Sequence, residues 1–255
     1  MRVLRTIAEI REAVEPFPEV GLVPTMGAFH EGHLSLFAAA RGENDLVVAS
    51  LFVNPSQFGP TEDLARYPRD EERDTELAEE AGVDILFAPS PEEMYPPGFD
   101  TWIEVGELGD RLEGKFRPGH FRGVATVCCK LFNIVRPSRA YFGQKDAQQA
   151  AVVKQVVKDL DLDVEIRVLP TIRDEDGLAL STRNAYLSPD ERDAALALPR
   201  ALATKDPAKA RDLLRDLEVD YVEEAELDGQ RVLAAAIRIG KTRLIDNVIL
   251  EGADR

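Results

Sequence analysis

The sequence predicts an α/β protein: a doubly wound, mostly parallel, Rossmann-like sheet followed by a second, smaller α+β domain. Through about the first 175 residues, short apolar runs alternate with amphipathic or charged stretches, which is typical of strand and helix units joined by right-handed crossovers. From Ser188 this alternation gives way to two helical stretches and then two strand-like runs. The 255 residues, 44% of them hydrophobic, therefore suit a larger domain over 1–175 and a smaller one over 176–255 that closes over a site.

The elements of the larger domain follow from apolar periodicity. Apolar runs predict strands at 20–23, 46–53, 83–88, 140–142 and 164–169. Amphipathic or charged stretches predict helices at 34–40, 62–81, 123–135 and 147–160. Residues 89–121 are rich in Pro and Gly, and we interpret them as a long excursion that can cover a site.

The smaller domain has its own pattern. Helices are predicted at 189–198 and at about 207–217. Strand-like runs follow at 221–227 and 234–250, and Gly240-Lys241 is expected to turn a hairpin within the second run.

Composition excludes several classes of protein. A formal charge of −16 argues against general binding to nucleic acid or to an anionic membrane. No apolar stretch reaches membrane-spanning length and the first residues do not resemble a signal peptide, so we expect a cytoplasmic protein. The two cysteines, Cys128 and Cys129, are adjacent within a helical pattern and are expected to be reduced residues in or near the core.

One window departs from the acidic character of the chain. Residues 115–145 carry seven Lys or Arg side chains and no Asp or Glu. The window is a candidate anion site, although several of its cations can simply solvate a helix face.

Two histidines lie in the turn between the predicted strand 20–23 and the helix that follows. In open α/β sheets ligands bind at the carboxyl ends of strands, and a helix amino terminus there suits phosphate. His30 and His33 are three residues apart, so on a first helical turn both rings can face one phosphate. A zinc site and two merely polar turn residues are the alternatives; the chain has one other histidine, His120, and the zinc spacing is not the usual one.

Two familiar ligand motifs are excluded. Gly240-Lys241-Thr242 ends like a phosphate-binding P-loop, but Ala235 occupies the position of its first glycine. Residues 174–177 resemble part of a calcium loop without its length or closing glutamate, so a turn is the better interpretation.

Three other places carry suitable chemistry. Asn54 and Gln57 offer amide groups for the hydroxyl and carboxylate groups of a small substrate. Residues 143–146 follow a strand and provide a lysine for phosphate and an aspartate for ribose, with Gln149 one helical turn further on. Residues 181–184 provide two hydroxyls and a guanidinium, a suitable polyphosphate clamp. Each has a plain alternative: a strand end, a helix cap and a domain linker.

Together these segments resemble the pantothenate synthetase (pantoate–β-alanine ligase) family. The resemblance runs in order over about three-quarters of the chain, whereas the two-histidine turn alone would imply only the wider nucleotidylyltransferase superfamily. It is carried by Pro24-Thr25-Met26-Gly27, His30-Glu31-Gly32-His33, Phe52-Val53-Asn54-Pro55, Gln57-Phe58-Gly59, Tyr67-Pro68-Arg69, Gly119-His120-Phe121-Arg122-Gly123-Val124, Phe142-Gly143-Gln144-Lys145-Asp146, Gln148-Gln149 and Ser181-Thr182-Arg183-Asn184.

The resemblance implies ATP-dependent ligation of (R)-pantoate to β-alanine through a bound pantoyl adenylate, in pantothenate and coenzyme A biosynthesis. Magnesium would travel on the ATP phosphates, with no metal-ligating residue in the protein, and the enzyme would be a homodimer. The catalytic residues implied are His33 as proton donor, His30, Lys145 and Arg183. The ATP site implied is Met26, Gly27, Ala28, Phe29, His30, Glu31, Gly32, His33, Gly143, Gln144, Lys145, Asp146, Ile172 by its backbone, Leu180, Ser181, Thr182 and Arg183; the pantoate site is Gln57, Gln149 and Asn54, with Gln57 also near β-alanine.

Two other functions stay open at this level. One is a nucleotidylyltransferase that moves AMP or CMP to a different acceptor, which Gln57 and Gln149 argue against because they suit a small hydroxy acid. The other is a non-catalytic nucleotide-binding regulator, which the intact set His30, His33, Lys145 and Arg183 argues against.

Overall fold

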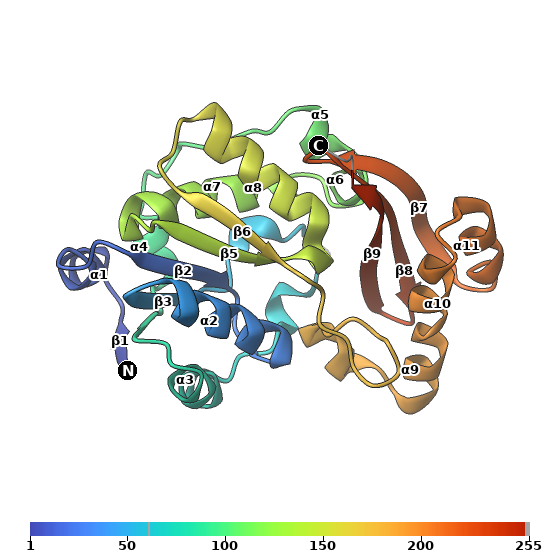
Figure 1. Cartoon of the computed structure of the whole chain (residues 1–255), viewed down its shortest axis with the longest axis horizontal. Helices are drawn as coiled ribbons and strands as arrows, with labels where there is room; N and C mark the ends of the chain where they lie inside the picture. The colour runs from blue at the N-terminus through green and yellow to red at the C-terminus, as the bar shows by residue number, and fades with distance from the viewer. Residues whose placement is uncertain (61, 253–255) are drawn as a thin grey trace. The chain divides into compact units, whose positions relative to one another are not determined.

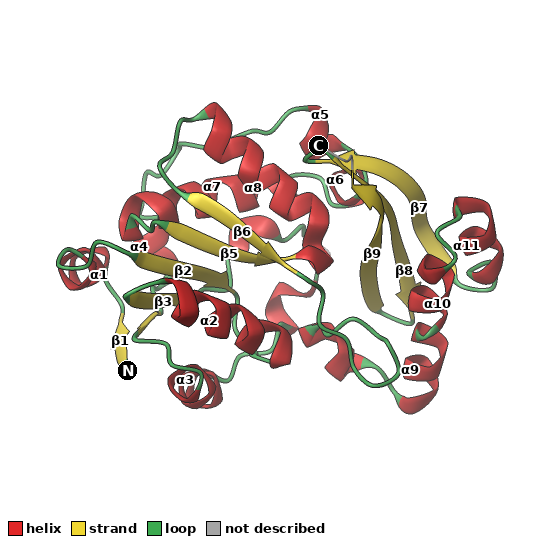
Figure 2. Cartoon of the chain, viewed as in Figure 1, coloured by secondary structure: helices red, strands yellow, loops and turns green. Residues whose placement is uncertain are grey.

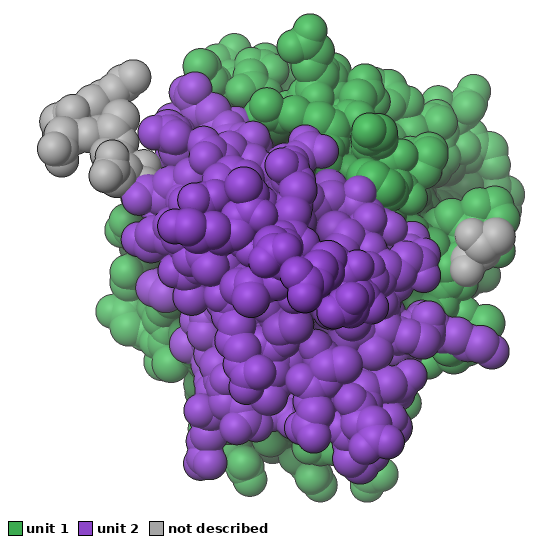
Figure 3. All heavy atoms as spheres, turned by 90° about the vertical axis from the view of Figure 1, so that its right-hand side faces the viewer, with its two compact units in different colours: residues 1–142, 152–169 green, residues 143–151, 170–255 purple. Residues whose placement is uncertain are grey.

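The computed structural model describes residues 1–60 and 62–252, and Figures 1 and 2 show its elements. The chain forms two compact units, coloured separately in Figure 3. Unit 1 consists of residues 1–142 and 152–169, and unit 2 consists of residues 143–151 and the described residues from Pro170 onward. No helix within these described ranges is both long enough and apolar enough to cross a bilayer.

A six-stranded sheet forms the centre of unit 1. Its order is β1 (Arg2–Leu4), β4 (Ile85–Phe87), β3 (Leu46–Leu51), β2 (Val20–Thr25), β5 (Arg139–Gly143) and β6 (Glu165–Leu169). The pairs β1 with β4, β4 with β3, β3 with β2, and β2 with β5 are parallel. Strands β3 and β4 follow β2 on one side, and β5 and β6 lie on the other, so the strand order reverses between β2 and β5. This is the predicted doubly wound sheet, and such a reversal is where open α/β sheets bind ligands.

Helices connect these strands (Figure 1). The α-helices are α1 (Ile7–Val14), α2 (Glu31–Glu43), α3 (Glu71–Glu80), α4 (Pro91–Met94), α5 (Glu107–Asp110), α6 (Glu113–Phe116), α7 (His120–Val135) and α8 (Ala147–Asp159), the last beginning in unit 2 and ending in unit 1. Three 3₁₀ turns lie at η1 (Pro55–Gln57), η2 (Asp63–Arg66) and η3 (Gln144–Asp146). A buried cluster packs α2 and α3 against the sheet through Phe29, Phe37, Ala40, Ala78 and Leu86, and α7 lies against β2 and α1.

The predicted helix 62–81 is wrong in its first half. Residues 63–66 form only a 3₁₀ turn, and α3 begins at Glu71 after the cap Asp70, whose side chain accepts from Arg73 N. Pro68 is the physical reason, because proline disfavours a helical residue before it and lacks an amide hydrogen. The sequence prediction also missed β1 and α1; β1 has three residues, two of them exposed, which is too short for a periodic pattern.

The cysteines lie where the sequence placed them. Both are free thiols on α7; Cys128 is buried and Cys129 is half-buried. Burial raises the pKa of the Cys128 thiol to about 12, which keeps it protonated and unreactive.

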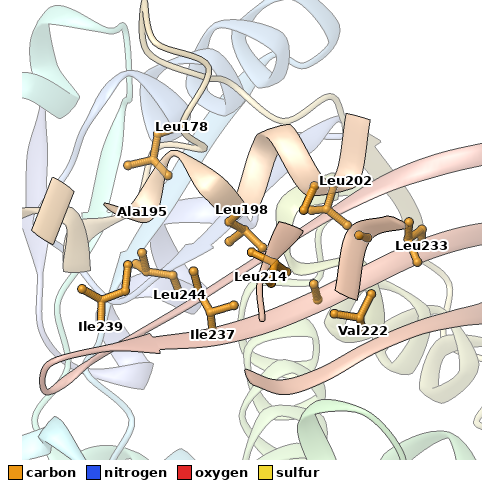
Figure 4. Packing of buried hydrophobic residues seen from close by; sticks show 13 residues of the cluster. Leu178, Ala195, Leu198, Leu202, Leu214, Val222, Leu233, Ile237, Ile239 and Leu244 are labelled. Atoms are coloured by element: carbon orange, nitrogen blue, oxygen red, sulfur yellow. The ribbon is translucent and has the colours of Figure 1, made fainter. Parts of the chain in front are cut away.

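Unit 2 contains a three-stranded antiparallel sheet in the order β7 (Glu218–Leu227), β8 (Gln230–Ile239) and β9 (Thr242–Gly252). Helices α9 (Pro189–Ala195), α10 (Ala197–Ala203) and α11 (Pro207–Leu213) and the 3₁₀ turn η4 (Thr182–Tyr186) precede it. Figure 4 shows the core, where Leu198 and Leu202 of α10 pack with Leu233 and Ile237 of β8. The predicted hairpin turn is confirmed, since β8 ends at Ile239 and β9 begins at Thr242.

The predicted helix 189–198 is two helices. Helix α9 ends at Ala195, Leu196 lies between the two, and α10 begins at Ala197. The proline ring of Pro199 would meet the carbonyl of residue 195 in a continuous helix, whereas proline is tolerated in the first turn of a new one.

Candidate active site

The turn after β2 has an unusual backbone. Gly27 has a φ of 86° and Ala28 a φ of 53°, so both lie in the left-handed region that favours glycine. Asp74 of α3 holds this turn: its Oδ2 accepts from Ala28 N at 2.8 Å and its Oδ1 accepts from Phe29 N at 2.7 Å. A Cβ on Gly27 would stand 2.8 Å from Asp74 Oδ2, so the close approach requires glycine. Burial raises the pKa of Asp74, although the two backbone hydrogen bonds act in the opposite direction.

The two histidines cap α2 reciprocally. His30 is the N-cap residue, and its Nδ1 accepts from Gly32 N at 3.1 Å, while Nδ1 of His33 accepts from His30 N at 3.3 Å. The ring centroids are 4.2 Å apart. Because both Nδ1 atoms accept hydrogen bonds, each neutral ring carries its proton on Nε2.

This capping changes how the turn can meet an anion. The sequence analysis expected the first amide groups of the helix to bind phosphate. Instead Gly32 N donates to His30 Nδ1, and His33 N and Leu34 N donate to the carbonyl of His30. Each neutral imidazole also carries an N–H group on Nε2, which is of the kind that can donate to a phosphate oxygen.

Asn54 and Gln57 form a buried amide pair after β3. Asn54 Nδ2 donates to Gln57 Oε1 at 2.8 Å and to the carbonyl of Gly123 at 3.2 Å. Its Oδ1 accepts from Ser56 Oγ and from the hydroxyl of Tyr95, each at 2.9 Å. Both amide hydrogens of Asn54 are thus used within the protein, and the bond to Oε1 fixes Gln57 with its Nε2 as the donor end.

Helix α7 supports this pair. Gly123 lies so close to η1 that a Cβ there would stand 2.3 Å from the carbonyl oxygen of Ser56. His120 Nε2 lies 3.0 Å from Arg117 Nη1, and His120 Nδ1 lies 2.9 Å from the carbonyl of Gln57. Since arginine can only donate, the Nδ1 of His120 carries the proton and donates to Gln57. Burial and the charge of Arg117 lower the pKa of His120 to about 4, so the ring is neutral.

Three arginines of the window 115–145 have acidic partners outside it. Arg117 pairs with Glu62 through two contacts of 2.8 and 2.9 Å, Arg122 pairs with Glu104 and stacks on Trp102, and Arg139 pairs with Glu19. Burial would raise the pKa of Glu62, but the hydrogen bonds and charge of Arg117 lower it overall. These three arginines are therefore neutralised by acidic partners within the fold.

In unit 2, a residue of β9 holds the loop 143–146. Asn247, which is 5% exposed, donates from Nδ2 to the carbonyls of Gln144 and Lys145 at 2.9 and 3.0 Å. Its Oδ1 accepts from Gln144 Nε2 at 3.1 Å. The ammonium of Lys145 lies 3.5 Å from a carboxylate oxygen of Asp146.

Asp246, the neighbour of Asn247 in β9, holds the segment 172–183 of unit 2 through Arg173. Asp246 is 2% exposed and receives two hydrogen bonds from Arg173, of 2.6 and 3.0 Å. Arg173 follows Ile172, whose carbonyl accepts from Leu180 N at 3.0 Å. Ser181 then caps η4, because its hydroxyl accepts from Arg183 N at 3.3 Å.

The predicted site residues divide between the two units. Within unit 1 the structure brings together the turn 26–33 on its own, and Asn54 with Gln57. Within unit 2 the loop 143–146, with Gln149 at the start of α8, and the segment 172–183 are tied to adjacent residues of β9. The sequence analysis missed Asp74, Asp246 and Asn247. Asp74 stands among three other acids of the first turns, Asp70, Glu71 and Glu72, and Asn247 is 102 residues from Lys145, so no local pattern marks either.

A doubly wound sheet with polar turns after the strands where its order reverses is typical of α/β nucleotide-binding enzymes. The sequence model of the family "Pantoate-beta-alanine ligase" matches residues 2–249. The chain belongs to this family.

Individual relatives agree. The pantothenate synthetase of Moorella thermoacetica is 51% identical over 283 aligned positions, covering 100% of both chains. The crystal structure of pantothenate synthetase from Thermus thermophilus superposes with a TM-score of 0.94 at 48% identity, covering 98% of this chain and 99% of the other. The ligase of Francisella tularensis, solved with β,γ-ATP and β-alanine, gives a TM-score of 0.90 at 36% identity and covers 99% of each chain.

Proposed function

We propose that this enzyme joins pantoate to β-alanine at the expense of ATP, through a pantoyl adenylate, releasing AMP and diphosphate. The observation that carries the proposal is the reciprocal cap of His30 and His33, which places the ring protons on Nε2. Family membership and the ATP and β-alanine complex of the Francisella ligase support the same substrates.

In the first step, a carboxylate oxygen of pantoate attacks the α-phosphorus of ATP, and the bond to diphosphate breaks. Negative charge grows on the phosphoryl oxygens and on the leaving group. The Nε2–H groups of His30 and His33 can donate to these oxygens, and the charges of Lys145 and Arg183 can balance them. Preorganised donors of this kind are often the largest catalytic contribution, and no protein nucleophile is required.

Pantoate would be held by the amides of Gln57 and Gln149. The Nε2 of Gln57 points its hydrogens away from Asn54, which suits a carboxylate or hydroxyl oxygen. Asn54 is among the residues expected from the sequence to contact pantoate. Its engaged amide supports a positioning role instead, in which it orients Gln57.

In the second step, the neutral amine of β-alanine attacks the acyl carbon of the adenylate, an amide bond forms and AMP leaves. Water must be kept from the adenylate during its lifetime. We assign this task to the excursion 89–121, whose aromatic side chains Tyr95, Phe99 and Trp102 pack on one another with centroids 5.1 to 6.0 Å apart.

The nucleotide would bind to residues of both units. The turn 26–33 would meet the phosphates, Asp146 the ribose, the backbone of Ile172 the adenine, and residues 180–183 the phosphates again. ATP would enter as its magnesium complex, so the metal is part of the substrate. Closure of the smaller domain over the site is part of the same proposal, as is a cytoplasmic location without membrane or nucleic-acid partners.

We also propose a homodimer. Sedimentation velocity at micromolar concentration should give a mass of about twice the 28.2 kDa of the chain. A single species at the mass of one chain would contradict the dimer and leave the catalytic proposal unaffected.

The reaction is tested by measuring AMP release from MgATP with pantoate alone, with β-alanine alone and with both. The expected result is AMP formed in equal amounts with pantothenate when both acids are present, and none after magnesium is removed with EDTA. ATP binding without turnover would identify a nucleotide-binding regulator, and AMP transfer to another acceptor would identify a different nucleotidylyltransferase; either result overturns the proposal.

A further inference from the structure

We propose that Asp74 is a positioning residue for the reaction: its carboxylate holds the turn that carries His30 and His33 in the conformation that aims both imidazoles. It acts through the backbone of Ala28 and Phe29 and does not itself contact the substrates. The kinetic part of this inference rests on the proposed function, whereas the structural part does not.

The geometry is that of a two-pronged acceptor. The two carboxylate oxygens of Asp74 accept separately from consecutive backbone amides, at 2.8 and 2.7 Å, and the residue is 1% exposed. A buried carboxylate is costly unless its oxygens are hydrogen-bonded, and bonds to a charged acceptor are stronger than neutral ones. The two backbone amides of Ala28 and Phe29 therefore compensate the burial of the Asp74 carboxylate.

The turn needs such support. Ala28 has a φ of 53°, and a non-glycine residue adopts this left-handed region only at a cost in free energy. A hydrogen bond to a charged group stabilises more than one between neutral groups, so the two bonds of Asp74 can offset that cost. Without them, Ala28 would favour a negative φ and the direction of the chain entering α2 would change.

The effect would reach the histidines directly. Phe29 is next to the N-cap residue His30, and its ring lies 5.4 Å from the ring of His33 and 5.1 Å from that of Phe37. Fixing Phe29 N thus fixes both the start of the cap and the packing of the second imidazole. A displacement of about 1 Å in a catalytic group can cost about 10²-fold in rate.

Asp74→Asn is the test variant, because asparagine keeps the size but replaces one acceptor oxygen with a donor. The matched control is Asp70→Asn, which removes the same charge from the cap of the same helix, where asparagine is an equally good N-cap. The chain has three histidines, so imidazole ¹⁵N spectra of the labelled protein should show three resolvable ring systems.

We expect Asp74→Asn to shift the ring signals of His30 and His33 but not of His120, and to slow adenylate formation by about 10²-fold. Asp70→Asn should change neither. Adding Ala28→Gly to Asp74→Asn should restore part of the rate, because glycine adopts a positive φ without help. A folded Asp74→Asn protein with unchanged histidine signals and unchanged rate overturns the inference.

A measurement on the unaltered protein covers the case in which Asp74→Asn does not fold. The amide hydrogens of Ala28 and Phe29 should exchange as slowly as those of the neighbouring strand β2. Exchange as fast as in exposed loops overturns the inference. Failure of the proposed ligation would leave the histidine spectra and amide exchange as predicted, so the two failures are distinguishable.

Discussion

The ring of His33 caps helix α2 through Nδ1, and in the proposed mechanism its Nε2–H group donates a hydrogen bond to a phosphate oxygen. We predict that His33→Ala slows adenylate formation by about 10²-fold or more, the usual loss when one such donor is removed. The loss of the cap should also cost about 0.5 to 2 kcal/mol of stability.

Rapid-quench measurement of pantoyl adenylate checks the rate, and urea unfolding checks the stability. Ser35→Ala is the control, since the Ser35 hydroxyl bonds to the Gly32 carbonyl in the same turn but takes no part in the cap. An unchanged adenylation rate in His33→Ala would remove His33 from the mechanism.

His120 makes the stability of unit 1 depend on pH. Its pKa is about 4 in the folded protein and 6.5 ordinarily, so between these values the unfolded chain binds more protons. The contribution of neutral His120 to the free energy of unfolding is therefore fully present above pH 6.5. It is lost as the pH falls toward 4, a loss of about 3 kcal/mol.

Urea unfolding across a pH series from neutrality down toward the folded-state pKa measures this slope, and the same series on His120→Asn isolates it. The native protein should lose stability across this range more steeply than the variant. Equal slopes would show that His120 titrates normally and is not the buried neutral donor to Gln57.

At the scale of elements, the approach of α7 to η1 sets the position of Gln57. Gly123→Ala would place a methyl group 2.3 Å from the Ser56 carbonyl, so the two elements must separate. We expect a loss of about 1 to 3 kcal/mol in stability, as for overpacked cores, and a raised KM for pantoate with little change in the KM for ATP.

Gly42→Ala is the matched control in α2, where an added Cβ meets nothing within 4 Å. It should stabilise the protein by up to about 1 kcal/mol through helix propensity. Thermal unfolding and steady-state kinetics on both variants distinguish local overpacking from a general effect of replacing helical glycines.

In unit 2, strand β9 sets the position of the loop 143–146. Asn247→Ala removes the three hydrogen bonds that hold Gln144 and Lys145, each worth about 1 kcal/mol. If about 1.4 kcal/mol of this stabilisation of the loop is lost from the free energy of ATP binding, the KM for ATP rises about tenfold.

Asn133→Ala serves as the control, because the hydrogen bonds that the Asn133 side chain makes among residues 1–60 and 62–252 go to Cys129 of its own helix. Isothermal titration with a non-hydrolysable ATP analogue separates binding from turnover. Unchanged ATP affinity in Asn247→Ala would show that the loop 143–146 keeps its conformation without β9.

For the whole molecule, local patterns predicted the fold well because most strands are continuous apolar runs. The strand at 20–23, the turn with His30 and His33, and the hairpin at Gly240-Lys241 all depend on near neighbours in the chain, and the structure contains all three. The helix predicted at 62–81 was too long at Pro68, and the helix predicted at 189–198 is divided just before Pro199. The charged or apolar periodicity continues through these positions, but a proline interrupts a helix.

The supports of the site were not predictable in this way. Asp74 contacts residues 45 and 46 positions earlier, and Asn247 contacts residues more than 100 positions earlier. Nothing in a stretch of acids or in an apolar strand distinguishes these two side chains from their neighbours. Their roles follow from which elements the fold places side by side, which periodicity alone does not give.

The tie between Asn247 and Lys145 also orders events during synthesis. The ribosome makes the loop 143–146 about a hundred residues before the side chain that fixes it. A nascent or truncated chain that has already formed the histidine turn thus lacks the support for its lysine. Incomplete chains that lack β9 should therefore bind ATP more weakly than the full chain.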